Sequence, residues 1–174
     1  MNLQKPNPSD YPTFYNTYIS LVKSNDIIKE IDGQHNEITE LLHSISEEKS
    51  TYAYSEGKWS IKVLLQHIID AERIFGYRML CIARGETISL PSFEENTYAN
   101  NCHANQREWK TLVKEFLNLR TSTKDLFLSL NETEFNKSGI IYNNPITALS
   151  LAYIIVGHTK HHLNILLERY LKAT

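Results

Sequence analysis

The sequence predicts an all-α protein, an antiparallel four-helix bundle preceded by a short N-terminal helical arm. Four long segments carry apolar side chains about 3.6 residues apart, the spacing of a helix that buries one face. The connections between these segments show no convincing strand pattern. Two connections, of about 15 and 20 residues, are longer than a minimal bundle needs, which leaves open a crossover between helices that are not simple neighbours.

The composition is that of an ordinary globular protein. Hydrophobic residues make up 41% of the 174 positions and charged residues 22%, so the chain can bury a substantial core. We expect one domain that spans residues 1–174. The net charge of −2 provides no basic excess for a phosphate backbone, and a nucleic-acid partner is therefore not expected.

Cysteine usage and hydropathy indicate a cytoplasmic protein. Two cysteines, Cys81 and Cys102, cannot form a disulfide framework, and the first residues lack the apolar core of a secretory signal. The longest apolar run, LAYIIVG at 151–157, is much shorter than the ~18 residues that suggest a membrane span. We therefore expect no membrane segment.

The N-terminal part of the chain contains the arm and the first long helix. Early prolines fix φ and remove backbone donors, so the first residues are expected to be irregular. Aromatic and apolar residues at helical spacing predict a short helix over about 13–23. The first long helix is predicted over about 24–46, with Ser24 or Asp26 as its N-cap. Gly33 lies inside it and marks a position where it could break.

The second long helix begins after Ser60, covers about 61–85 and ends at Gly85, a residue suited to the left-handed C-terminal cap. The next stretch, 86–105, contains Pro91 and many Asn and Ser residues, and is predicted to be an ordered loop near the mouth of the fold. Loops in such places commonly shape binding sites.

Two further long helices complete the predicted bundle. The third is predicted over about 106–130, and a connector over about 131–145 follows it. The fourth is predicted to begin at Pro145, which suits the first turn of a helix, and to end at Leu171.

Three of the seven histidines lie among apolar residues in the middle of predicted helices: His67 in the second, and His158 and His162 in the fourth. At about 100° per residue, His158 and His162 lie about 40° apart on one helix face, so their rings can converge on one point. His67 lies on an equally apolar face and can supply a third ring. Three neutral imidazoles leave the charge of a dication uncompensated and coordination positions open, as in catalytic metal sites.

Core packing is the alternative interpretation of each histidine taken alone, because a single buried histidine is usually a satisfied core residue. Three inward histidines on two helices are harder to explain in this way, since each ring carries a polar nitrogen that needs a partner. His161 could replace one ligand or hydrogen-bond nearby. The four-residue spacing nevertheless favours the pair of His158 and His162.

Three further residues are candidates for contacts around this site. Asp70 could accept a hydrogen bond from the second ring nitrogen of His67, with ordinary surface charge as an equal alternative. Arg78 and Arg169 each follow a candidate ligand by eleven residues, so both are predicted to face inward and could hold an anionic substrate group. An arginine that reaches solvent along the core edge is the commoner explanation. The remaining histidines are predicted to be solvated: His35, His43 and His103.

The segments YAYSEGKWSIKVLLQHIIDAERIFGYRMLCIARGE (52–86) and GHTKHHLNILLERYL (157–171) resemble the DinB superfamily. These are damage-inducible, metal-binding four-helix proteins, relatives of the thiol S-transferases that act with bacillithiol or mycothiol. The resemblance extends over nearly the whole chain, and its specific part is one early histidine in the second helix plus HxxxH in the last. It implies that His67, His158 and His162 bind a divalent ion, commonly zinc or nickel.

The first hypothesis that the resemblance supports is a metal-dependent enzyme that transfers a low-molecular-weight thiol to an electrophile, in which the ion lowers the pKa of the thiol and holds the thiolate for attack. Hydrolysis by the same metal is one alternative, and a non-catalytic metal-binding or ligand-binding protein of a stress response is the other. No serine or cysteine triad is evident, so the metal is expected to carry the chemistry as a Lewis acid. The many aromatic residues of the arm and the third helix further predict a homodimer.

Overall fold

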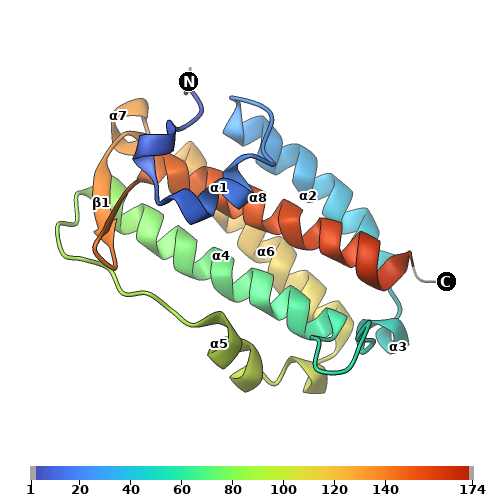
Figure 1. Ribbon diagram of the computed structural model, residues 1–174. Helices are drawn as coiled ribbons and strands as arrows, with labels where there is room; N and C mark the ends of the chain where they lie inside the picture. Colours follow the sequence, from blue (N-terminus) through green and yellow to red (C-terminus); the bar gives the residue numbers. More distant parts are fainter. Residues whose placement is uncertain (1–2, 173–174) are drawn as a thin grey trace.

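The computed structural model describes residues 3–172 and shows an all-α protein built around a four-helix bundle (Figure 1). The prediction of this fold class with a short N-terminal helical arm is confirmed. No helix within residues 3–172 has the length and apolar character needed to cross a membrane. The long helices are α2 (Ile27–His43), α4 (Ile61–Arg84), α6 (Trp109–Leu128) and α8 (Ala148–Ile165), and Leu166–Leu171 continues α8 as a π-helix.

The four helices are not arranged in simple sequential order. α4 packs between α6 and α8, and α2 contacts the same two helices, so the consecutive helices α2 and α4 lie across a diagonal of the bundle. The connection after α4 returns along the bundle, so that α4 and α6 run parallel (Figure 1). In agreement, Lys62 at the start of α4 donates to the carbonyl oxygen of Arg107, just before α6, at 2.6 Å. The predicted all-antiparallel order is therefore wrong, and the crossover that the sequence left open is present.

Several short elements lie in the segments predicted to be irregular: α3 (Glu47–Ser50), α5 (Glu95–Asn101), α7 (Glu132–Phe135) and an antiparallel hairpin of β1 (Ser138–Ile141) and β2 (Asn144–Thr147). The expectation of no strand is thus wrong. Pro145 lies in β2 rather than in the last helix, which begins at Ala148. The hairpin turn places Tyr142 and Asn143 at positive φ, without the glycine that usually marks such a turn in a sequence.

Polar caps set the helix starts. The side chains of Asp26, Ser60 and Thr147 each accept a hydrogen bond from a backbone N–H in the first turn of the following helix. Gly85 ends α4 in the left-handed conformation with φ 91°. The boundaries predicted at Asp26, Ser60 and Gly85 are confirmed, whereas α2 continues through Gly33 without a break.

Two apolar clusters fill the bundle. One includes Ile31 and Phe75, toward the arm and the hairpin, and the other includes Ile38 and Phe116, toward α3. Where the clusters meet, all four long helices contribute buried polar side chains: Gln34, His67, Glu72, Arg120, Thr123, His158, Thr159 and His162. Burying polar groups costs free energy unless they find partners, so this polar layer requires an explanation.

The arm places α1 (Asn16–Ile19) directly against α8. A Cβ atom at Gly157 would lie 2.2 Å from the carbonyl oxygen of Tyr18, so only glycine permits this approach. The ring of Tyr18 consequently lies edge-on to His158, with 5.1 Å between ring centroids. The arm therefore covers one side of the polar layer.

Candidate metal centre

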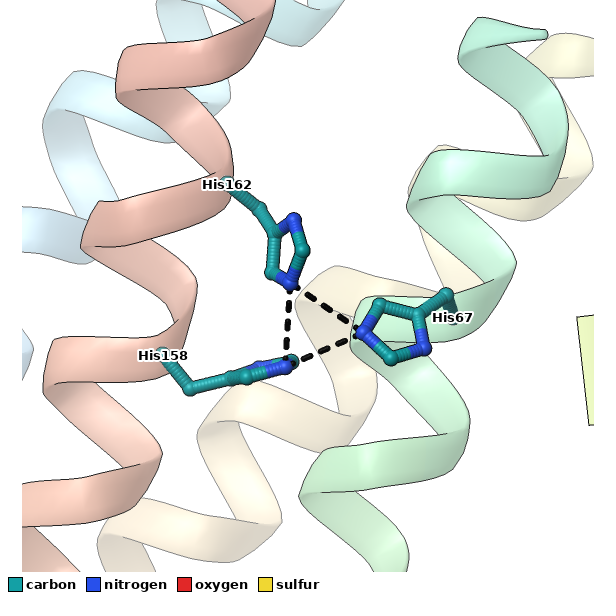
Figure 2. Close-up of side chains that lie close together, drawn as sticks. All are labelled: His67, His158 and His162. Atoms are coloured by element: carbon teal, nitrogen blue, oxygen red, sulfur yellow. Dashed lines mark hydrogen bonds between the residues drawn. The ribbon is translucent and has the colours of Figure 1, made fainter. Parts of the chain in front are cut away.

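Three imidazoles from two neighbouring helices meet in the polar layer. His67 lies on α4, and His158 and His162 lie one turn apart on α8 (Figure 2). Their Nε2 atoms form a triangle in which each pair is 3.1 Å apart. The residues are buried, with exposed fractions of 4%, 4% and 9%. The convergence expected from helical spacing is therefore present.

The three contacts cannot all be hydrogen bonds. An imidazole nitrogen carries either a proton or a lone pair in the ring plane, so it donates or accepts but does not do both. In a triangle of three such atoms, at least one contact must join two donors or two acceptors. Three lone pairs that face a common centre remove this conflict only when a cation lies between them.

The spacing also fits a metal ion. Two nitrogen atoms at about 2.05 Å from one ion are about 2.9 Å apart at an octahedral angle and about 3.4 Å apart at a tetrahedral angle. The observed 3.1 Å lies between these values for all three pairs. Within residues 3–172, these are the residues grouped closely enough to act together as metal ligands. The donor set therefore fits a divalent ion.

Burial keeps the three rings in the form that binds metals. The pKa is lowered to about 4 for His67 and to about 3 for His162, mainly by burial and to a smaller extent by neighbouring histidines. The pKa of His158 is also lowered well below its ordinary value, mainly by burial. All three imidazoles are consequently neutral near pH 7, with lone pairs available.

Two predicted neighbours of the triad make other contacts. Asp70 accepts a hydrogen bond from the side chain of Gln66 at 2.9 Å, and no hydrogen bond between Asp70 and His67 is present in the described part of the chain. His161 is half-buried and packs edge-on against Tyr18, and its ring centroid is 5.0 Å from that of His162. His161 does not join the group of converging ligand atoms.

The two candidate arginines have opposite environments. Arg78 is buried, in agreement with its predicted inward orientation, and it lines the cavity described below. Arg169 is exposed, so the prediction that it faces inward is wrong. It lies in the π-helix Leu166–Leu171, where each residue advances by less than about 100°, so the eleven-residue spacing no longer returns to the same face.

A cavity of about 340 Å³ reaches the triad at His67 and His158. Its walls come from the arm, α4, the loop before α5, the hairpin and α8, and they include Tyr15, Phe75 and Phe93. A separate cavity of about 270 Å³ is lined by His162 together with Trp59 and Tyr170. A larger groove between α2 and α8, about 670 Å³, contains none of the candidate site residues.

Sequence reasoning missed the aromatic side chains around the triad. The ring of Trp59 lies 4.9 Å from that of His67, and Phe75 lies 5.7 Å from His158, between centroids. Tyr18 covers His158 from the arm. The helical spacing of aromatic residues in the arm was the available signal for Tyr18, but it indicated packing and not what the ring packs against.

Comparisons with known proteins agree with this fold. A curated protein of Oceanobacillus iheyensis, provisionally named a metal-dependent hydrolase, is 23% identical over 146 residues, which cover 83% of this chain and 84% of the relative. The solved structure of YfiT from Bacillus subtilis, described as a probable metal-dependent hydrolase with an unusual four-helix bundle topology, superposes with a TM-score of 0.69. The identity is 15%, with 92% of this chain and 88% of YfiT covered.

Two further structures share the bundle. A mycothiol-dependent maleylpyruvate isomerase has a TM-score of 0.66 at 9% identity, with 83% of this chain and 61% of that chain covered. YjoA, a DinB-like protein of Bacillus subtilis, has a TM-score of 0.58 at 20% identity, with 81% and 86% covered. The family model of the DinB superfamily matches residues 30–166, which contain all three converging histidines. The chain belongs to the DinB superfamily.

Proposed function

We propose that the protein is a divalent-metal-dependent enzyme that transfers a low-molecular-weight thiol to an electrophile, with His67, His158 and His162 as the metal ligands and zinc or nickel as the ion. The observation that carries the proposal is the triangle of Nε2 atoms, each 3.1 Å from the other two, at the wall of a cavity. No internal pairing of protons and lone pairs accounts for that geometry.

When bound, the ion supplies Lewis acidity and lowers the pKa of a coordinated thiol or water. The side chains of the protein set the charge at the site and its access to water. Three neutral imidazoles leave the positive charge of the ion uncompensated, which strengthens its attraction for a developing thiolate. Aromatic rings from Tyr18, Trp59 and Phe75 surround the imidazoles and reduce the access of bulk water, so electrostatic interactions at the site are screened less.

The choice of a thiol is supported by the mycothiol dependence of one structural neighbour. The names given to the Oceanobacillus relative and to YfiT favour a second candidate, metal-dependent hydrolysis at the same residues. Both reactions use the same ligands, and they differ in whether a thiol or water attacks.

A paired activity screen separates these candidates. Protein prepared without a histidine tag and loaded with zinc or nickel is assayed for conjugation of several small thiols to chlorodinitrobenzene, and for hydrolysis of p-nitrophenyl acetate. The expected result is thiol-dependent conjugation that is lost in His162→Ala and retained in His161→Ala, the matched neighbour. Ester hydrolysis without conjugation would favour the hydrolase. Activity that survives a chelator and replacement of all three histidines would contradict both candidates.

The homodimer predicted from the sequence remains part of this proposal. Its measurement is light scattering at micromolar concentration, where a particle of 20.2 kDa would contradict it.

A further inference from the structure

Arg78 is a buried cation on the wall of the cavity that reaches the triad. It follows His67 by eleven residues on α4, so the two residues share a helix face. Side chains on a helix tilt toward its N-terminus, which directs the guanidinium of Arg78 back toward His67. The residue is only 3% exposed, so it does not reach solvent along the edge of the core.

The partners of this guanidinium are neutral. Its Nη2 atom donates to the carbonyl oxygen of Pro91 at 2.7 Å, and its carbon Cζ lies 5.8 Å and 5.5 Å from the ring centroids of Phe75 and Phe93. The hydroxyl of Tyr15 lies beside it. Among residues 3–172, no carboxylate forms an ion pair with Arg78, whereas the equally buried Arg120 is paired with Glu72.

Two carboxylates also line the cavity, and both are exposed. Glu94 is the N-cap of α5 and accepts a hydrogen bond from the backbone N–H of Thr97 at 2.8 Å. This bond keeps the carboxylate of Glu94 at the start of α5. Glu95 lies close enough to Tyr18 to raise the pKa of that hydroxyl, although burial is the larger cause. The cavity thus combines an unpaired buried cation inside with acidic groups at exposed positions.

We propose that this cavity binds a small organic carboxylate with a planar or aromatic body, and that Arg78 holds its carboxylate. An unpaired buried charge costs several kcal/mol, and a bound anion offsets that cost. The flat guanidinium matches a carboxylate through two parallel hydrogen bonds, and the rings of Tyr15, Phe75 and Phe93 suit an apolar body. The volume of about 340 Å³ is within the range of small-molecule sites.

The proposed function bears on this inference in one respect, namely that the bound carboxylate would be the substrate of that enzyme. Binding to Arg78 itself requires no metal, so the test uses metal-free protein. The probe is trans-cinnamate, and its neutral control is cinnamamide, which has the same body without the charge. Titration calorimetry is carried out on the wild type and on Arg78→Met, Arg78→Lys and Arg169→Met. The last variant is the matched control, because Arg169 is exposed.

The expected result is that cinnamate binds the wild type and Arg169→Met equally, and that Arg78→Met weakens it by about tenfold to a hundredfold, to the level of cinnamamide. Arg78→Lys keeps the charge without the planar fork and is expected to be intermediate. Glu95→Gln removes a negative charge that repels the carboxylate of cinnamate, and is expected to strengthen binding slightly.

Three outcomes would overturn the inference: equal binding of cinnamate and cinnamamide to the wild type, undiminished cinnamate binding by a folded Arg78→Met variant, or no binding of cinnamate at millimolar concentration. The first comparison needs no variant, so it decides the matter even when Arg78→Met fails to fold. A carboxylate that binds through the ion instead would bind only the metal-loaded protein and would be lost in His162→Ala. Failure of the proposed metal chemistry would leave binding to Arg78 unchanged.

Discussion

The histidine triad and the ion pair of Glu72 and Arg120 lie in the same buried polar layer, yet they are assembled in opposite ways. Arg120 lies 2.9 Å from Glu72, and both side chains are almost completely buried. Thr123 donates to Glu72 at 2.6 Å, and Arg120 donates to Thr159 at 2.5 Å. Burial raises the pKa of Glu72 and lowers that of Arg120, and the opposite charge of the partner counteracts both shifts.

The triad has no such complement. It brings three identical neutral groups within 3.1 Å of one another, where complementary donors and acceptors would be expected in a structural network. Unpartnered atoms do not make this difference, because Nδ1 of His162 and both Nε and Nη1 of Arg120 are buried without a hydrogen-bond partner among the described residues. Buried polar groups that find opposite charges within the chain hold the helices together. Three imidazole nitrogens that face one another find no complementary group within the chain, so we expect a bound cation to satisfy them.

The largest expected effect is the loss of metal from His162→Ala. Removing one ring from a set of three ligands leaves too few donors for tight binding, so metal content is expected to fall from about one ion per chain to background. Plasma mass spectrometry of protein purified without a tag measures it. His161→Ala is the control and should keep its metal. Full occupancy in the His162→Ala variant would show that the triad is not the site.

The ion pair is expected to matter for stability and not for metal binding. Arg120→Met leaves the carboxylate of Glu72 buried without its partner and should lower the free energy of unfolding by about 3–5 kcal/mol. Urea denaturation measures this. The double variant Glu72→Leu with Arg120→Met removes both charges and should recover a large part of the loss. A double variant no more stable than Arg120→Met would argue that the pair is not the source of the effect.

Gly157→Ala tests how the arm is held over the triad. The added Cβ meets the carbonyl oxygen of Tyr18 at 2.2 Å, so α1 must shift, at an expected cost of about 1–3 kcal/mol. Gly76→Ala is the matched control, because a Cβ at Gly76 on α4 meets nothing within 4 Å. The control should gain up to about 1 kcal/mol from the better helix propensity of alanine. Thermal unfolding compares the two, and equal behaviour would contradict the close approach.

The smallest effect on the free energy of unfolding is expected from a partly exposed ion-pair group, in contrast to the buried pair of Glu72 and Arg120. Glu115 on α6 pairs with Arg73 and Arg107, which are partly exposed. Burial raises the pKa of Glu115, but hydrogen bonds from both arginines outweigh this, and the pKa is lowered from 4.5. A lowered pKa in the folded state means that the stabilisation is present above about pH 4.5 and is lost as the pH falls through the folded-state value.

Glu115→Gln should therefore lower the free energy of unfolding by less than about 1 kcal/mol near pH 7, with the difference from the wild type vanishing at acid pH. Urea denaturation at several pH values checks this. Glu108→Gln is the control, because Glu108 is the exposed N-cap residue of the same helix, α6. An effect near pH 7 as large as that of Arg120→Met would contradict the distinction between buried and exposed pairs.

Much of the fold could be predicted because it depends on local chemistry. The period of the apolar residues identified four long helices, and the polar caps Asp26 and Ser60 and the cap glycine Gly85 marked their boundaries. The hairpin was not predicted, because strands of four residues are too short to show a clear alternation of apolar and polar side chains, and they pair through backbone groups that every residue carries. The direction of α6 also escaped, because helical periodicity is the same in either orientation.

The sequence by itself determined that three histidines lie on apolar helix faces, since residue spacing on a helix depends only on the regular backbone. Only the tertiary structure decided what each polar residue meets. Arg78 and Arg169 stand at equal distances from candidate ligands in the sequence, yet one is buried at the cavity and the other is exposed beyond the start of the π-helix. The physical reason is that burial and pairing depend on neighbouring helices, whose packing no single segment encodes.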